Sequence, residues 1–280
     1  MHCIRLCELD EKVIFDCFKN AFSDYIVPMD MTYEAFLTML FYRGYTADLS
    51  FGIVENDHLV GFVINGTDTS KPAQVYDIST GIIPAYQGQG LGRVLLKYTV
   101  DSLKKSNFND YSLEVITSNT QAIKSYSSLG FIIEKELVTY ELSYAIEQGQ
   151  TSNHVEKTTL ADILNLTKFN DYKPSWQNDV QAIIRAEETL SFYVYRLNGQ
   201  SVAYAIIDLK TGNISQLAVI DSKRRKGIAT ELMLHLITVI HCDKIRIINC
   251  DKRDRGLECF LKEFGFKLKI RQFEMKYRIE

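Results

Sequence analysis

Proline and glycine are scarce in this sequence, with 4 prolines and 15 glycines among 280 residues. Collagen-like chains need glycine at every third position, and mucin-like or disordered chains are rich in proline, so the composition excludes these classes. Hydrophobic residues make up 46% of the chain and charged residues 24%. A chain of this composition can bury a core, and its length suggests two domains of ordinary size.

Long apolar runs are also missing. The longest nearly uncharged apolar stretch, Leu232–Ile240, contains His235 and is far shorter than the roughly 20 residues that span a bilayer. The first nine residues carry His2, Arg5 and Glu8 with no apolar segment behind them, which is unlike a secretory signal. We therefore expect a cytoplasmic protein without a membrane partner.

Cysteine spacing gives no sign of a disulfide framework or a metal site. No C-x-x-C pair is present, and no two histidines have the spacing of zinc ligands. The six cysteines form two groups near the ends of the sequence: Cys3, Cys7, Cys17, Cys242, Cys250 and Cys259. We expect small buried thiols and no bound metal.

Acidic and basic residues nearly balance, with a formal net charge of −3, so the whole chain lacks the basic excess of a nucleic-acid-binding protein. Residues 1–152 hold 11 basic and 19 acidic residues, whereas residues 153–280 hold 21 and 16. The basic half is compatible with steering an anionic ligand, with docking on the acidic half or with a solvated surface. We expect no nucleic-acid partner; salt-dependent binding through the basic half is the remote alternative.

The sequence contains an internal repeat. Residues 87–92 (QGQGLG) and 224–229 (RRKGIA) share the pattern Q/R-x-x-G-x-G/A and begin 137 residues apart. Residues 129–131 (LGF) and 264–266 (FGF) match at a separation of 135. Two matches at nearly one period predict a duplicated domain.

Both repeats show one order of expected elements: a strand, two helices, a hairpin, a strand that runs into the glycine turn, a helix, a strand, a helix and a final strand. In the first repeat these are 3–6, 10–21, 32–41, 50–54 with 59–65, 75–83, 93–103, 111–116, 120–129 and 131–142. In the second they are a strand near Val155, then 160–169, 179–188, 191–207, 213–220, 230–241, 244–248, 256–264 and 266–277. The polar segment 148–153 reads as a linker, so the expected domains are 1–147 and 154–280.

A glycine turn between a buried strand and a helix leaves backbone N–H groups unpaired at the positive end of the helix dipole, which makes an anion site. Side chains at positions 90 and 92 would stand between these amides and a phosphate. A dinucleotide-binding fold is one alternative, with Glu114 in the following strand. It is disfavoured because the glycines are spaced G-x-G-x-G, several elements precede the turn, and residues 84–86 separate the strand from it.

The two turns resemble the pyrophosphate-binding signature of the GNAT superfamily of acyl-CoA-dependent N-acetyltransferases. The first reads IIPAYQGQGLGRVLL and the second LAVIDSKRRKGIATELM, and the resemblance covers nearly the whole chain as two tandem copies. It implies an α+β fold of two tandem GNAT-like domains, each a mixed, mostly antiparallel twisted sheet flanked by helices. It also implies transfer of an acetyl group from acetyl-CoA to a primary amine, without a metal.

The resemblance further implies which residues hold the cofactor. In this family the strand before the turn splays from its neighbour and its backbone bonds the pantetheine arm, a role that falls here on Ile82 and Ile83. The turn that would hold the pyrophosphate comprises Gln87, Gly88, Gln89, Gly90, Leu91, Gly92 and Arg93.

Residues 119–131 (NTQAIKSYSSLGF) resemble the second signature of the family. By this resemblance Asn119 bonds the cofactor arm, and the hydroxyl of Tyr126 lies near the CoA sulfur. A phenol that donates a hydrogen bond as charge develops would speed departure of a thiolate whose pKa is about 8.5. The alternative is that Tyr126 is an ordinary tyrosine at the edge of the core, with its hydroxyl in water.

The second repeat departs from this signature. Asp254 stands in the position of Asn119, Leu261 stands in that of Tyr126, and the nearest aromatic residue, Phe260, has no proton to donate. We therefore expect catalysis in the first domain and leave open whether the second domain binds CoA.

An acceptor amine must be neutral to react, which calls for a base or a water relay near the strand before the turn. Asp77 is the only carboxylate on that strand in the first repeat, and residues 211–220 of the second repeat contain none. Asp77 is thus the candidate base. A solvated charge, a turn acceptor, or catalysis by backbone and water are the alternatives.

The region that covers the acceptor in this family is aromatic here, with nine aromatic residues between Phe15 and Tyr45. Helical spacing predicts that most lie in the core, while several tyrosines near residues 28–30 are candidates to line a pocket for a small-molecule or peptide amine. The tyrosines are Tyr25, Tyr33, Tyr42 and Tyr45, and the second repeat offers Tyr172 and Trp176. The alternative to an enzyme is a sensor or assembly module that binds CoA without catalysing a reaction.

Overall fold

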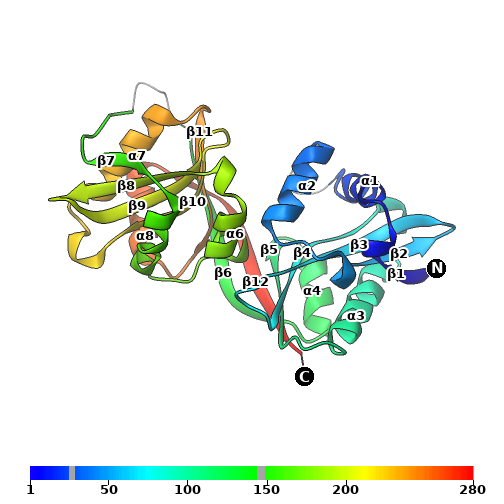
Figure 1. Ribbon diagram of the computed structural model, residues 1–280. Coiled ribbons are helices and arrows are strands. Elements are labelled where there is room, and N and C mark those ends of the chain that lie inside the picture. The colour runs from blue at the N-terminus through cyan, green and yellow to red at the C-terminus, as the bar shows by residue number, and fades with distance from the viewer. Residues whose placement is uncertain (25–28, 144–148, 280) are drawn as a thin grey trace. The chain divides into compact units, whose positions relative to one another are not determined.

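The computed structural model describes residues 1–24, 29–143 and 149–279, which form two compact units (Figure 1). Unit 1 consists of Met1–Glu134 together with Phe273–Glu280, and unit 2 consists of Lys135–Gln272. Within the described ranges, no helix has the length and apolar character needed to cross a membrane.

The expected order of elements is present in both repeats. The first repeat forms β1 (His2–Arg5), α1 (Glu11–Ala21), α2 (Tyr33–Tyr42), β2 (Phe51–Glu55), β3 (His58–Thr67), β4 (Gln74–Ile82), α3 (Leu91–Leu103), β5 (Asp110–Ile116), α4 (Thr120–Ser128) and β6 (Ile132–Ser143). The second forms β7 (Val155–Thr158), α5 (Leu160–Leu164), α6 (Val180–Arg185), β8 (Ser191–Leu197), β9 (Gln200–Asp208), β10 (Asn213–Val219), α7 (Ile228–Val239), β11 (Lys244–Asp251), α8 (Arg255–Phe264) and β12 (Lys267–Arg278).

Local chemistry accounts for many of these boundaries. The Asp10 carboxylate accepts a hydrogen bond from the N–H of Lys12 at the start of α1, and Asp179 caps α6 in the same way. The hairpin of β8 and β9 turns at Asn198-Gly199, whose φ angles are 49° and 76°, as a tight hairpin turn requires. The predicted helix over 160–169 is wrong in its second half, because α5 ends at Leu164 and a short 3-10 turn follows.

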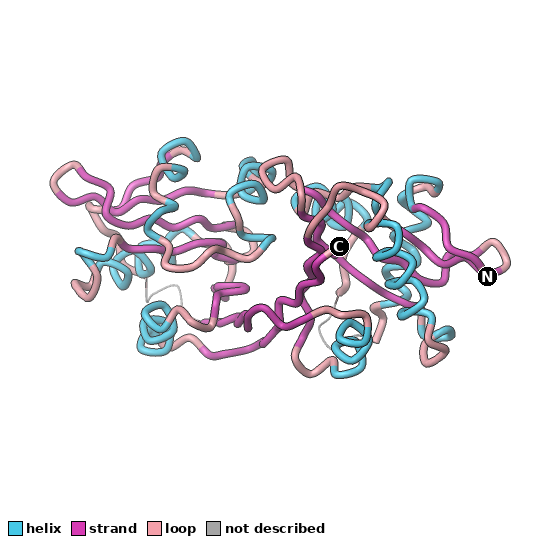
Figure 2. The backbone as a smooth tube through the Cα atoms, turned by 90° about the horizontal axis from the view of Figure 1, so that it is seen from below, coloured by secondary structure: helices cyan, strands magenta, loops and turns pink. Residues whose placement is uncertain are grey.

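Helices cover both faces of the sheet in unit 1 (Figure 1). On one face α1 packs through Phe18, whose ring lies 5.9 Å from that of Phe62 on β3. On the other face α3 and α4 bury Leu95 and Tyr126 in one core cluster. Unit 2 repeats the arrangement, with α7 and α8 in one core cluster and α5 and α6 in another, and helices flank the strands of each unit (Figure 2).

The sheets are mixed and mostly antiparallel, which confirms the predicted fold class. In unit 1 the order is β1-β2-β3-β4-β5, followed by the end of β12, and among the pairings within β1 to β5 only that of β4 with β5 is parallel. In unit 2 the order is β6-β11-β10-β9-β8-β7, and only the pairing of β10 with β11 is parallel.

The last strand of each repeat completes the unit built mainly by the other repeat. Strand β6 pairs antiparallel with β11, with Leu142 opposite Ile245, while the C-terminal end of β12 belongs to unit 1, where Ile279 donates to the carbonyl of Asn109 at 2.8 Å. The compact units therefore do not follow the predicted division at 148–153. Both strands have the expected alternating pattern, but that pattern does not specify which neighbour they pair with.

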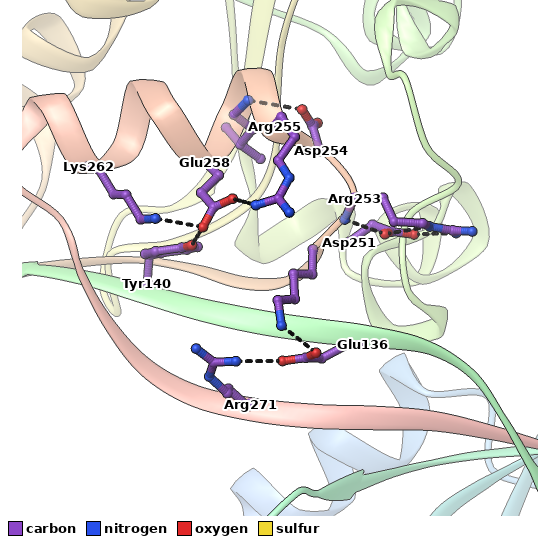
Figure 3. Close-up of polar contacts among 11 residues, drawn as sticks. Glu136, Tyr140, Asp251, Arg253, Asp254, Arg255, Glu258, Lys262 and Arg271 are labelled. Carbon is purple, nitrogen blue, oxygen red and sulfur yellow. Dashed lines mark hydrogen bonds and ion pairs between the residues drawn. The ribbon is translucent and has the colours of Figure 1, made fainter.

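Ion pairs and hydrogen bonds hold β6 in unit 2 (Figure 3). Glu136 accepts from Lys252 at 2.6 Å and from Arg271 at 3.0 Å, and the Tyr140 hydroxyl donates to Glu258 at 3.3 Å. These contacts join a strand of the first repeat to the residue that follows β11, to β12 and to α8 of the second.

Candidate functional site

Strands β4 and β5 of unit 1 separate before they end. They are paired from Gln74 opposite Asp110 to Asp77 opposite Leu113, yet β4 continues to Ile82. The pairing of β3 with β4 shifts register at the same level, where Asn65 lies opposite Asp77. The last residues of β4 thus present a backbone edge that β5 does not cover, as the resemblance implied.

The two residues expected to hold the pantetheine arm, Ile82 and Ile83, differ in whether their backbone groups already form hydrogen bonds within the protein. Ile83 donates its N–H to the carbonyl of Val60 at 3.0 Å and accepts from the N–H of Tyr86 at 2.9 Å. Because successive peptide groups of a strand point to opposite edges, the N–H of Ile82 points away from β3, toward the side of the departing strand. Ile82 is therefore the better placed of the two.

The glycine turn has the conformation that its sequence requires. Gly88 and Gly90 have φ angles of 75° and 78°, and Gly90 is the N-cap of α3. A Cβ built on either residue has no atom within 4 Å, so open space faces the turn. Nothing in the described part of the chain accepts a hydrogen bond from the N–H groups of residues 88–92, which matches an anion site.

The side chains of the remaining residues of the turn attach it to the preceding segment and to the core. Gln87 donates from its side chain to the carbonyl of Ile82 at 2.9 Å, and Gln89 donates to that of Ala85 at 3.3 Å. The buried side chain of Leu91 anchors the helix start in the core, Gly92 lies beside it, and Arg93 is exposed on the first helical turn.

Asp77 is buried inside β4, with 5% of its surface exposed, which excludes the solvated alternative. Its Oδ2 accepts a hydrogen bond from the Thr80 hydroxyl at 2.6 Å, and its Oδ1 has no hydrogen-bond partner among the residues described. Burial raises the pKa of this carboxyl to about 7, and the hydrogen bonds from Thr80 and the backbone of Ser79 oppose the shift. A carboxyl of this kind exchanges a proton near neutral pH.

Asn65 and Tyr111 adjoin Asp77, and sequence reasoning missed both. The Tyr111 hydroxyl donates to Oδ1 of Asn65 at 2.9 Å, and both side chains are fully buried. The Asn65 amide donates to the carbonyl of Leu49 at 2.6 Å. No motif indicated this pair; a buried polar residue in the apolar strand 58–67 was the only available sign.

Tyr126 and Asn119 lie on α4 and at its start. Tyr126 is buried, with 7% of its surface exposed, and its ring packs 5.6 Å from that of Phe131. The Asn119 side chain accepts from the N–H of Ala122 at 3.1 Å and so caps the helix. Asp254 caps α8 through Leu257 at 2.9 Å, which explains why both repeats carry Asn or Asp here (Figure 3).

The aromatic residues of α1 and α2 are mostly core, as expected. The Phe36 ring lies 5.4 Å from that of Phe15 and 5.0 Å from that of Phe18. The Tyr33 ring lies 5.4 Å from that of Phe15 and so extends this cluster. Tyr25 lies outside the described residues. An open hollow of about 480 Å³ lies beside α1, lined by Asp16, Lys19, Asn20, Phe22, Ser23, Met29 and Asp30.

The corresponding gap in unit 2 is filled by the chain itself. Strands β10 and β11 pair at only two positions, and the 3-10 turn Trp176–Asn178 adjoins both strands beyond them. Asn178 donates to the carbonyl of Ile248 on β11 at 2.7 Å, and its own carbonyl accepts from Gln216 on β10 at 2.7 Å. Beside these contacts lies a pocket of about 60 Å³, to which Tyr172 contributes, while Trp176 is buried.

The second turn is also bound by its own unit. Arg224 forms two hydrogen bonds with the Asp171 carboxylate, at 2.7 and 3.1 Å, and a third with the carbonyl of Val219 at 2.9 Å. Arg225 adopts a φ of 56° at the position of Gly88, where a side chain is strained. Gly227, with a φ of 80°, matches Gly90, so the second turn keeps the backbone conformation of the first and differs from it in its side chains.

Comparison with known proteins connects these features to one family. The acetyltransferase (GNAT) family matches residues 14–131 and 158–266. The ribosomal protein bS18-alanine N-acetyltransferase of Escherichia coli K12 is 39% identical over 83 residues, which cover 30% of this chain and 54% of that protein. The chain therefore matches about half the length of this curated relative.

Two solved structures share the whole fold. A GCN5-related N-acetyltransferase from Sphaerobacter thermophilus has a TM-score of 0.71 at 15% identity, covering 96% of this chain and 92% of that one. A tandem GNAT protein from the clavulanic acid biosynthesis pathway has a TM-score of 0.72 at 12% identity, covering 100% and 98%. At these identities the likeness shows the tandem fold.

Proposed function

The chain belongs to the acetyltransferase (GNAT) family, and from that premise we propose that unit 1 transfers an acetyl group from acetyl-CoA to a primary amine. The observation that carries the proposal is the separation of β4 from β5, which ends in a turn with unpaired N–H groups and open space in front of it. An edge of free backbone followed by an anion site fits an elongated ligand with an amide-containing arm and a pyrophosphate.

In this proposal the N–H groups of residues 88–92 bind the pyrophosphate, and the backbone of Ile82 bonds the pantetheine arm. The side-chain oxygen of Asn119 caps α4, and its NH₂ group would donate to the arm. Gln87 keeps the turn attached to the end of β4, so the arm and the phosphates are held by one rigid segment.

Asp77 and Tyr126 are the proposed base and acid. The amine nitrogen attacks the thioester carbonyl carbon, a C–N bond forms and the C–S bond breaks. Asp77 accepts the amine proton, directly or through water, and Tyr126 donates its hydroxyl proton to the departing sulfur. A carboxyl with a pKa of about 7 is matched to this exchange at neutral pH.

We place catalysis in unit 1 alone. In unit 2 Asn178 bridges the two strands that would have to admit the pantetheine arm, Arg224 is engaged by Asp171, and Leu261 replaces the proton donor. Displacing Asn178 would leave buried amide and carbonyl groups unpaired, which is costly. Unit 2 therefore has a structural role in this proposal.

The acceptor is a primary amine of a small molecule or a peptide. Among the relatives, one is named for acetylating an alanine of ribosomal protein bS18 and another is a mycothiol acetyltransferase from Renibacterium salmoninarum, so the names span both classes. The hollow beside α1 is lined by two carboxylates, Asp16 and Asp30, and one cation, Lys19, and Asp16 also pairs with Lys12 at 3.3 Å; the charge of the hollow therefore does not favour one class of amine.

A screen of polyamines, amino sugars, amino acids and peptide N-termini, with detection of the CoA thiol, tests the function. We expect thiol release that depends on one acceptor class and falls by about 100-fold or more in Asp77→Asn. Tight acetyl-CoA binding without release for any amine would favour the sensor alternative.

A further inference from the structure

The C-terminal end of β12 forms part of the core that holds Tyr126. Met275 is fully buried in the same cluster as Tyr111, Tyr126 and Phe131. Lys276 forms an ion pair with Asp110 at 2.9 Å beside it. Residues contributed by the end of the second repeat thus lie in the same core cluster as the proposed acid of unit 1.

Tyr277, an aromatic residue of this strand, is connected to Tyr126 by ring contacts through Phe131. The Tyr277 ring lies 5.5 Å from that of Phe131, and Phe131 lies 5.6 Å from Tyr126 and 5.4 Å from Tyr111. Phe131 is buried, with 2% of its surface exposed. It is therefore held between the two tyrosines of the core and Tyr277.

The approach of Tyr277 is close enough to restrict its neighbours. A Cβ built on Gly130 would lie 3.2 Å from Cε2 of Tyr277, a tight contact at a residue whose φ of 100° already favours glycine. The N–H of Phe131 donates to the carbonyl of Tyr126 at 3.2 Å, which ties Phe131 to the end of α4. Without the Tyr277 ring, Phe131 would gain room to turn away from Tyr126.

We propose that Tyr277, contributed by the second repeat, is a positioning residue that holds Tyr126 in place through Phe131. The inference rests on the proposed function, because it assumes that Tyr126 donates a proton. It gives the second repeat a direct effect on turnover in unit 1 without requiring that unit 2 bind a substrate. Misplacing a catalytic group by about 1 Å can reduce a rate by about 100-fold.

The duplicated structure supplies a matched control. Leu142 occupies in β6 the repeat position that Tyr277 occupies in β12, and it lies 3.7 Å from the corresponding Cβ position of Gly265 in unit 2. Leu142→Ala therefore removes a side chain from the equivalent place in the unit without the proposed acid. We expect it to leave turnover within about twofold of wild type, as a substitution remote from the reacting groups should.

The test is a double-mutant cycle in the full chain. With chemistry shown to limit the rate, Tyr277→Ala should lower kcat by about 10-fold to 100-fold, leave acetyl-CoA affinity within about twofold, and be largely rescued by Tyr277→Phe. In the Tyr126→Phe background, Tyr277→Ala should reduce kcat by less than about twofold further. If Tyr277→Ala does not fold, Tyr277→Leu replaces it, with a smaller loss expected.

The cycle separates the two ideas. An equal loss of kcat in both backgrounds would overturn the positioning role alone, since Tyr277 would then act independently of Tyr126. A wild-type kcat in Tyr126→Phe would overturn the acid assignment, and this inference with it. Equal losses of turnover in Leu142→Ala and Tyr277→Ala would also overturn the positioning role.

Discussion

At the scale of the residue, Asp77 combines burial with an unpartnered oxygen. Its Oδ2 is held by Thr80, while Oδ1 lies buried without a hydrogen bond from any described residue. A structural carboxylate is normally paired on both oxygens, because an unsatisfied buried polar atom destabilises the fold. The unpaired Oδ1 is the atom of Asp77 that is left to exchange a proton, which agrees with the proposed role as a base.

Asp77→Asn should lower kcat/KM by about 100-fold or more and remove the rise with pH that a base produces. In the wild-type protein, kcat/KM should rise as pH increases through about 7, because the pKa of Asp77 is raised to about 7 and the charged form is the base. The measurement is a pH–rate profile of both proteins at saturating acetyl-CoA. A wild-type profile in Asp77→Asn would assign the base to another group or to water.

The same substitution should stabilise the protein in a defined pH window. The folded-state pKa of Asp77 is raised above the unfolded value of about 4, so the folded chain binds the proton more tightly and loses stability as pH rises from about 4 to about 7. Asp77→Asn avoids this loss. Its melting temperature should exceed that of wild type at pH 8 by more than at pH 4, measured by thermal unfolding at both values.

At the scale of the element, two strand–turn–helix segments with similar sequences have different surroundings. Gly90 and Gly227 are N-caps with φ angles of 78° and 80°, so a substitution strains both helices to the same degree. Among the described residues, nothing accepts from the N–H groups of residues 88–92 or from those of residues 225–229; the second turn differs in that the Arg224 side chain is bound by Asp171. The two glycines therefore form a matched pair for testing which turn binds acetyl-CoA.

Gly90→Glu should weaken acetyl-CoA binding by about 100-fold or more, because a carboxylate would face the pyrophosphate and like charges in contact cost several kcal/mol. Gly227→Glu should leave affinity and turnover within about twofold of wild type. Calorimetric titration of the two folded variants decides this, with one equivalent of acetyl-CoA expected for wild type. Loss of binding in Gly227→Glu with retention in Gly90→Glu would move the active site to unit 2.

At the scale of the whole molecule, the two units share strands rather than a simple linker. Strand β12 begins in unit 2 and ends in unit 1, so unit 1 loses its last strand when β12 is released. Unfolding of either unit should therefore destabilise the other. A chain of two independent domains joined at residues 148–153 would not behave in this way.

We expect a single calorimetric unfolding transition that saturating acetyl-CoA shifts to higher temperature as a whole. Leu232→Ala, a change at a fully buried residue of unit 2, should destabilise the protein by roughly 2–5 kcal/mol and lower that one transition. Differential scanning calorimetry of both proteins, with and without acetyl-CoA, is the measurement. Two transitions, of which acetyl-CoA moves only one, would show that the units unfold separately.

The sequence by itself determined the repeat, the order of elements and the glycine turn, because these depend on local patterns. Alternating and helical hydrophobic periods specify strands and helices, and positive φ angles select glycine at positions 88 and 90. The same patterns showed that the second repeat lacks a counterpart of Tyr126. They did not show that Asn119 and Asp254 both cap helices, because Asn and Asp are common both as helix caps and as ligand-binding residues.

Only the tertiary structure decided which neighbours the last strands pair with, how deeply Asp77 is buried, and what fills the gap in unit 2. Each depends on contacts between residues far apart in the sequence, such as Asn178 with Ile248. The final strands β6 and β12 have similar alternating patterns, so pairing within a repeat and exchange between repeats look alike in the sequence. In the exchanged arrangement Tyr277 packs against Gly130 and Phe131, a contact between the two repeats that no local pattern specifies.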